Sequence, residues 1–239
     1  MEGHKGHRKR MKEEFLQGGL DHMQPHRVLE MLLFYAIPQG DTNELAHRLI
    51  ERFGSLTGVL DASCDELMDV SGIGSHAAVL IHFISALARY YYTEKANINP
   101  VKDPLKNIAQ KMVAQYVGYT EERLILVCLD NTLKELFFGM VKVGVADAVQ
   151  LQFRDLAKIA LRYDATNVIL GHNHPNGMAL PSRADRETTI EIARGFRDLG
   201  INLLDHIIVA GADYISLAES GILAGMLRND PPQEELWRR

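Results

Sequence analysis

Two histidines separated by one residue, and followed by a serine and an aspartate, form the part of this sequence with the most evident chemistry. His172 and His174 come directly after the apolar run 167–171, which predicts a buried strand that ends in glycine. Side chains alternate between the two faces of a strand, so both imidazoles project to the same side. Asp185 could supply a third ligand from the next element. Catalytic zinc sites use three protein ligands and leave a fourth position to water. The pattern therefore predicts a catalytic type of zinc site.

The serine and the aspartate also have a purely structural interpretation. Ser182 is suited to the N-cap of a helix, and Asp185 then falls at the third helical position, which is close to a capping box. The turn-rich segment 175–181 could fold this helix start back over the histidines. A carboxylate in the first helical turn can cap the helix and still reach the strand before it. A His-x-His pair alone is weak evidence, and it is the combination that predicts a metal site.

Composition limits the classes of protein to which the chain can belong. Its 239 residues are 46% hydrophobic and 24% charged, which is typical of a globular protein with an ample core. A net charge of -5 gives no overall attraction to nucleic acid or to anionic membranes. The longest apolar stretch, 77–88, is too short to span a bilayer, and the N-terminus lacks the apolar segment of a secretory signal. Cys64 and Cys128 lie far apart, which favours reduced thiols in a cytoplasmic protein.

The first part of the chain has the periodicity of helices. Residues 1–12 form a basic leader that we expect to be loosely ordered. Apolar residues then recur at spacings of three and four as far as Tyr92, and Gly54 marks a helix end. The predicted helices cover about residues 29–36, 45–53, 65–70 and 77–92. We therefore expect an all-helical domain over residues 1–95.

Beyond a predicted linker at 96–105, strands alternate with helices. Asp103 and Pro104 are typical of a helix start. The predicted strands cover residues 124–129, 136–143, 168–171, 202–209 and 214–217, and the predicted helices cover 104–117, 153–163 and 182–199. This order indicates an α/β domain over 106–228, a mixed sheet flanked by helices, with a frayed tail at 229–239.

The chain resembles the RadC family, whose metal centre is of the JAMM (MPN+) type. The resemblance rests on Gly-His-Asn-His-Pro at 171–175, Pro-Ser-x-x-Asp at 181–185 and Leu-Asp-His-Ile-Ile-Val at 204–209. Residues 45–60 and the turn at 72–74 also look like the helix-hairpin-helix module of that family. The resemblance implies a JAMM/MPN-like sheet with a cytidine-deaminase-like layout, preceded by a small helix-hairpin-helix-like domain.

The resemblance also implies roles for the motif residues. His172, His174 and Asp185 would hold one zinc ion per chain, which lowers the pKa of its bound water from ~15.7 to about 7. Ser182 would donate a hydrogen bond to the developing oxyanion. The implied protein is a zinc metallohydrolase that cleaves a peptide or isopeptide bond in a protein or peptide substrate.

A general base completes the implied site. Members of the family carry a glutamate eight residues before the aspartate that ends the first strand, and this spacing selects Glu122, eight before Asp130, over Glu121. Without the resemblance, either glutamate would be read as a solvated charge at a strand start. His206 lies among apolar residues, and we expect a buried, hydrogen-bonded histidine; a role behind the metal ligands is the alternative.

Other functions remain open at this point. The Gly72-Ile73-Gly74 turn could offer backbone N–H groups to a DNA phosphate. Residues 1–95, however, carry ten Lys/Arg against thirteen Asp/Glu, so a helical packing or dimerisation module is an equal alternative. The alternative functions are a DNA-associated repair or recombination factor with a structural or vestigial metal site, and a protein-binding scaffold. A single zinc without a second carboxylate cluster argues against a two-metal nuclease.

Overall fold

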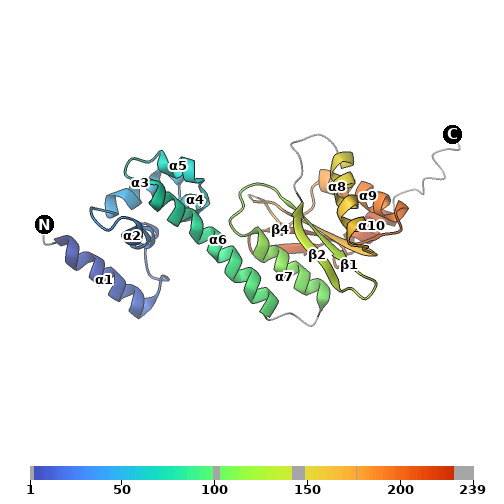
Figure 1. Cartoon of the computed structure of the whole chain (residues 1–239), viewed down its shortest axis with the longest axis horizontal. Helices are drawn as coiled ribbons and strands as arrows, with labels where there is room; N and C mark the ends of the chain where they lie inside the picture. Colours follow the sequence, from blue (N-terminus) through green and yellow to red (C-terminus); the bar gives the residue numbers. More distant parts are fainter. Residues whose placement is uncertain (1–2, 99–102, 142–148, 176, 229–239) are drawn as a thin grey trace. The chain divides into compact units, whose positions relative to one another are not determined.

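The computed structural model describes residues 3–98, 103–141, 149–175 and 177–228, and the chain divides into two compact units at Tyr90/Tyr91 (Figure 1). The division falls within α6 (Ser75–Ile98). Because α6 extends to Ile98, residues 96–98 of the segment predicted as a linker are helical. The tail predicted to be frayed, 229–239, lies outside the described residues. In the described part of the chain, no helix is both long and apolar enough to cross a membrane.

The first unit is built from short helices around a small apolar core. Its elements are α1 (Gly3–Gly18), α2 (Pro25–Ala36), α3 (Asn43–Phe53), α4 (Leu56–Asp61), α5 (Cys64–Met68) and the first part of α6. Gly54 ends α3 in the left-handed conformation with φ +80°, which confirms the predicted helix end. The sequence pattern did not predict α4, a single short helix whose N-cap is the hydroxyl of Ser55. The most deeply buried residues of this core include Leu29, Leu33, Leu49, Val59, Leu67 and Ile81.

The prediction that the basic leader is loosely ordered was wrong. Residues 3–12 of the leader lie within α1, where Met11 is buried beside residues of α2. The guanidinium of Arg8 donates three hydrogen bonds, of 2.8 to 3.1 Å, to carbonyl oxygens that follow α2. These contacts join residues about thirty positions apart, so the local composition of the leader could not reveal them.

The second unit is a five-stranded sheet with helices on both faces, as predicted. Its elements are α7 (Pro104–Tyr116), β1 (Leu124–Leu129), β2 (Glu135–Val141), α8 (Val149–Arg162), β3 (Asn167–Asn173), α9 (Arg183–Asp198), β4 (Asn202–Ala210), β5 (Asp213–Ser216) and α10 (Ile222–Arg228). The strand order is β2-β1-β3-β4-β5, and only β3 and β4 are parallel. The sheet is therefore mixed, as the α/β pattern indicated, and α10 is an addition to the predicted elements.

Alternate residues of β1 and β3 pack against different helices. Residues such as Val127 and Ile169 belong to the core that includes α7, whereas Val168 and Leu170 belong to the core that includes α8 and α9 (Figure 1). All seven residues of β3 are buried, because this central strand has a neighbour on each side and helices on both faces. The alternation continues to the end of β3, so it decides on which face its last side chains lie.

Candidate metal centre

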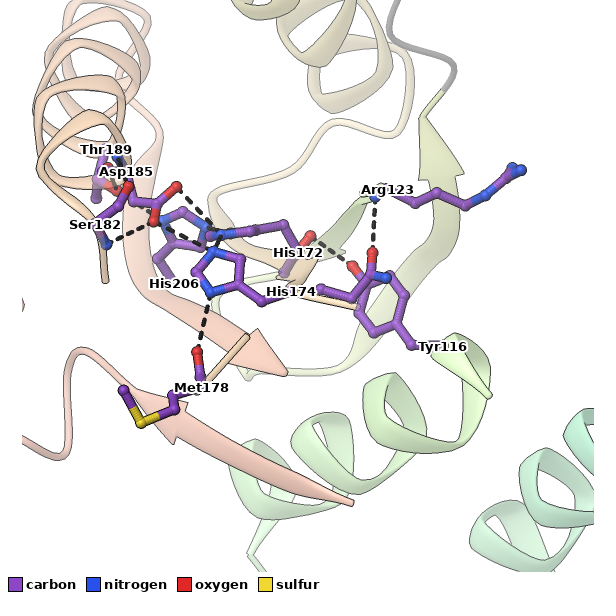
Figure 2. Close-up of polar contacts among 11 residues, drawn as sticks. Tyr116, Arg123, His172, His174, Met178, Ser182, Asp185, Thr189 and His206 are labelled. Atoms are coloured by element: carbon purple, nitrogen blue, oxygen red, sulfur yellow. Dashed lines mark hydrogen bonds and ion pairs between the residues drawn. The ribbon is translucent and has the colours of Figure 1, made fainter. Parts of the chain in front are cut away.

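The candidate centre lies where the end of β3 meets the start of α9 (Figure 2). His172 is in β3, and His174 follows its last residue, with its backbone N–H held by the carbonyl oxygen of Val209 in β4 at 2.8 Å. Asp185 is in the first turn of α9. The predicted placement of both imidazoles on one face of the strand is confirmed, because their rings lie 4.7 Å apart between centroids.

Three ligand atoms converge at this point. The Nε2 atoms of His172 and His174 are 2.9 Å apart, and the carboxylate oxygens of Asp185 lie 3.2 Å from the first and 3.4 Å from the second. Tetrahedral zinc bonds of ~2.0–2.1 Å would place ligand atoms about 3.3 Å from one another. The three side chains keep 10 to 19% of their surface exposed, so the group is open to solvent on one side.

The hydrogen bonds behind His172 decide which of its ring nitrogens carries the proton. Thr189 has one hydroxyl proton and donates it to the carbonyl oxygen of Asp185 at 2.5 Å. Its oxygen must therefore accept from Nδ1–H of His206, which lies 2.6 Å away. Nε2 of His206 then has no proton and accepts from Nδ1–H of His172 at 2.8 Å. As a result, Nε2 of His172 presents a lone pair to the centre.

His174 has the same tautomer as His172, but a different contact sets it. Nδ1 of His174 lies 3.0 Å from the carbonyl oxygen of Met178, which can only accept, so this nitrogen carries the proton. The two Nε2 atoms thus face each other as lone pairs at 2.9 Å, beside the carboxylate of Asp185. Such an arrangement is repulsive by itself, and a cation bound between the three groups would stabilise it.

The electrostatic environment keeps the ring of His172 neutral and its partner carboxyl ionised. Burial lowers the pKa of His172; Asp185 opposes this shift, His174 adds to it, and the resulting pKa is about 4. Burial likewise lowers the pKa of His206 to about 3. For Asp185 burial raises the pKa, but hydrogen bonds from Ser182 and the two nearby imidazoles outweigh it, and the net pKa lies below its usual value. Neutral imidazoles and an ionised carboxylate are the forms that bind a metal.

Ser182 occupies the N-cap of α9, as the sequence predicted. Its Oγ accepts from the backbone N–H of Asp185 at 3.1 Å, and the carboxylate of Asp185 accepts from the backbone N–H of Ser182 at 2.7 Å. This capping box turns the carboxylate of Asp185 back toward the strand end. The capping and metal-site interpretations are therefore compatible in the folded chain.

Glu122 lies just before β1 with an exposed side chain. Among the described residues, no hydrogen bond or ion pair joins its carboxylate to the three converging groups. Its backbone is nevertheless close to them, because Leu124 pairs with His172 across β1 and β3. Glu121 forms a 3.5 Å ion pair with Arg123.

Three residues of this region were missed or incompletely assigned from the sequence. Thr189 and Asn173 were not singled out, although each is a buried polar side chain. Thr189 shares the buried face of α9 with Ile192 and Phe196, so a hydroxyl at helical spacing from Asp185 was the available signal. His206 is buried and hydrogen-bonded as predicted, and it also lies directly behind His172.

The predicted Gly-x-Gly hairpin lies in the first unit, before α6. Gly72 has φ +98°, a conformation that favours glycine, and Ile73 is buried. Arg48 lies at this turn and donates to the carbonyl oxygen of Ser71 at 3.1 Å while it also pairs with Glu44. DNA association through Gly72 and Gly74 stays a prediction.

Comparison with known proteins agrees with the geometry. The RadC-like JAB domain family matches residues 102–222. A UPF0758 protein of Fusobacterium nucleatum subsp. nucleatum is 32% identical over 225 residues, which cover 91% of this chain and 97% of that protein. The first match contains all the converging residues, and the second extends over most of the helical unit as well.

Proposed function

Since the chain belongs to the RadC family of JAB-domain proteins, we propose that it is a zinc-dependent hydrolase that cleaves a peptide or isopeptide bond. The observation that carries the proposal is the set of two imidazole lone pairs and one carboxylate that face a common point. The separations of 2.9 to 3.4 Å are close to the edges of a zinc tetrahedron, and the partial exposure of the side chains leaves room for a substrate oxygen.

The donor set favours zinc over the hard cations Ca²⁺ and Mg²⁺. Ca²⁺ and Mg²⁺ prefer oxygen ligands, whereas two imidazoles and one carboxylate are typical of zinc. A zinc ion held by His172, His174 and Asp185 would polarise a substrate carbonyl and lower the pKa of a coordinated water to about 7. The contacts of His206 and of the Met178 carbonyl orient the two imidazoles, which is the usual arrangement around histidine ligands.

Glu122 is the residue we propose as the proton carrier. Leu124 lies opposite His172, and partners across an antiparallel pair share a face of the sheet. If the alternation continues two residues upstream, Glu122 lies on the face of both imidazoles and Glu121 lies on the other. Glu122 would take a proton from the attacking water and return it to the leaving amine. This placement on the face of the imidazoles supports the choice of Glu122 that the family spacing implied.

Ser182 would stabilise the negative charge that develops on the substrate oxygen. Its Oγ accepts the backbone N–H of Asp185, and its side chain is exposed next to a metal ligand. A hydroxyl in this place can donate a hydrogen bond to an oxyanion. Loss of one such donor typically slows catalysis ~100- to 1,000-fold, the scale expected for Ser182→Ala.

The first experiment measures zinc per chain after expression with zinc. We expect about one ion in the wild type, and little in His172→Ala or His174→Ala, because each substitution removes one of three ligands. His76→Ala is the matched control, since His76 is exposed in the first unit and should leave the zinc content unchanged. A wild type as free of zinc as the ligand variants would refute the proposal.

The second experiment tests the reaction. Dye-labelled casein and an internally quenched peptide with one lysine isopeptide bond serve as probes. We expect the wild type to cleave at least one of them, and Glu122→Gln to lose ~100- to 10,000-fold in rate while it retains zinc. Glu121→Gln is the control and should retain most of the rate. A zinc-loaded wild type that cleaves neither probe would contradict the proposed hydrolysis.

A further inference from the structure

Asn173 stands between the two histidines, and its side chain has an unusual set of partners. It is 4% exposed, and its Oδ1 accepts from the backbone N–H of Arg123 at 2.7 Å. Its Nδ2 donates to the carbonyl oxygen of Glu121 at 3.1 Å. One primary amide therefore binds the backbone on both sides of Glu122. Its orientation is fixed by these partners, because a flipped amide would pair donor with donor and acceptor with acceptor.

This contact extends the pairing of two strands beyond its last backbone pair. The register of β1 and β3 ends at Leu124 and His172, and the next residues in line are Arg123 and Asn173. Here the side-chain amide of Asn173 supplies the acceptor and the donor that a strand backbone would supply. The segment around Glu122 is therefore tied to the residue that separates the two histidines.

The carboxylate of Glu122 has no hydrogen bond or ion pair among the described residues, so only its backbone can fix its position. A glutamate has three rotatable side-chain bonds, so a mobile backbone would spread its carboxylate over many positions. Proton transfer requires the carboxylate within hydrogen-bond reach of the reacting group, and a displacement of ~1 Å can lower a rate about 100-fold. Fixing the backbone at both ends of the residue removes the contribution of the backbone to this spread.

We propose that Asn173 is a positioning residue that holds Glu122 at the metal centre through the backbone of residues 121 and 123. The inference rests on the proposed function, because it concerns the proton carrier of the same site. It assigns the residue between the histidines a role that differs from metal binding. Substitution of Asn173 should thus affect proton transfer and leave the ligands in place.

Asn167 provides a matched control at the opposite end of β3. It is also buried, at 8% exposed, and its Nδ2 donates to the carbonyl oxygen of Asp130 and to the hydroxyl of Thr166, both at 3.0 Å. Asn167→Ala removes comparable hydrogen bonds from the same strand at a distance from Glu122. A purely structural role of Asn173 would make the two alanine variants behave alike.

The first measurement is amide hydrogen exchange at Arg123 in the metal-free full-length protein. We expect exchange at least ~10-fold faster in Asn173→Ala, because the N–H loses its acceptor, and no such change in Asn167→Ala. Asn173→Asp keeps the acceptor but loses the donor to Glu121, so exchange should lie between wild type and Asn173→Ala. This milder variant serves if the alanine variant does not fold. Unchanged exchange in both variants at position 173 would overturn the inference.

The second measurement is the rate of cleavage of the quenched isopeptide probe, or of labelled casein, by the zinc-loaded protein. In Asn173→Ala we expect kcat to fall about 10- to 100-fold, KM to stay within about twofold and the zinc content to stay unchanged. In the Glu122→Gln background the same substitution should cause no further fall, because the group it positions is gone. Wild-type kcat in Asn173→Ala, or an equal fall in Asn167→Ala, would refute the positioning role alone. A wild type that cleaves neither probe would instead refute the proposed function, and the positioning role with it.

Discussion

Gly171 permits the close approach of α7 to β3 directly beneath the candidate metal centre, and its substitution gives a quantitative test of the packing. A Cβ at this position would lie 2.9 Å from Cε of Met112 and would overlap its sulfur, whereas ordinary contacts begin near 3.4 Å. Met112 is fully buried, so its side chain cannot turn into solvent. The hydroxyl of Tyr116 donates to the carbonyl oxygen of Gly171 at 2.7 Å and holds the helix in place.

The magnitude follows from this overlap. Gly171 is not among the glycines with positive φ, so alanine can adopt its backbone conformation and the cost is steric. One extra methyl group in a close-packed core typically destabilises by about 1–3 kcal/mol. Alanine also reduces the backbone entropy of the unfolded chain, which stabilises the folded state by ~0.4–1 kcal/mol. We therefore expect Gly171→Ala to lower the free energy of unfolding of the second unit by about 1–2 kcal/mol and to weaken zinc binding, because His172 is the next residue.

The assay is urea unfolding of the full chain, with hydrogen exchange of β1 and β3 to identify the transition of the second unit. Met112→Ala alone should destabilise by about 2–5 kcal/mol because it leaves a cavity. The double variant should be more stable than the sum of the single effects by at least ~1 kcal/mol, since the new methyl group occupies part of that cavity. Gly225→Ala is the control: no atom lies within 4 Å of its Cβ position in α10, so it should be neutral or slightly stabilising. Strict additivity of Gly171→Ala and Met112→Ala would refute the packing argument.

Two further predictions concern the histidines. Thr189→Val removes the hydroxyl that sets the tautomer of His206, and we expect zinc affinity to fall about 10- to 100-fold in competition with a chelator; Thr166→Val, which alters a hydroxyl at the far end of β3, should leave it unchanged. The pKa of His172 in the folded protein, about 4, lies below the ~6.5 of an unfolded chain, so its contribution to stability is present above pH 6.5 and is lost as the pH falls toward 4. This pKa shift corresponds to about 3 kcal/mol in the free energy of unfolding. We therefore expect the free energy of unfolding of the metal-free protein to differ less between pH 7.5 and pH 4.5 in His172→Gln than in the wild type. An equal pH dependence in the two proteins would show that the imidazole is not held neutral by burial.

Much of the second unit could be predicted because its elements carry strong local signals. The apolar run at 124–129 and the capping pair of Ser182 and Asp185 fall where β1 and α9 begin in the structure. The one-residue spacing of the two histidines was enough to place them on one face. The first unit was harder, because α1 is held by contacts from distant residues and α4 is only one short helix.

The sequence by itself determined which groups could bind a metal and that a strand end and a helix start would carry them, since alternation and capping act over a few residues. Only the tertiary structure decided that the lone pairs of both imidazoles face the carboxylate, because that depends on hydrogen bonds from Thr189, His206 and Met178. The clamp of Asn173 on the backbone around Glu122 likewise joins residues fifty positions apart. Such contacts form between elements whose separation along the chain hides them until the sheet brings β1, β3 and α9 together.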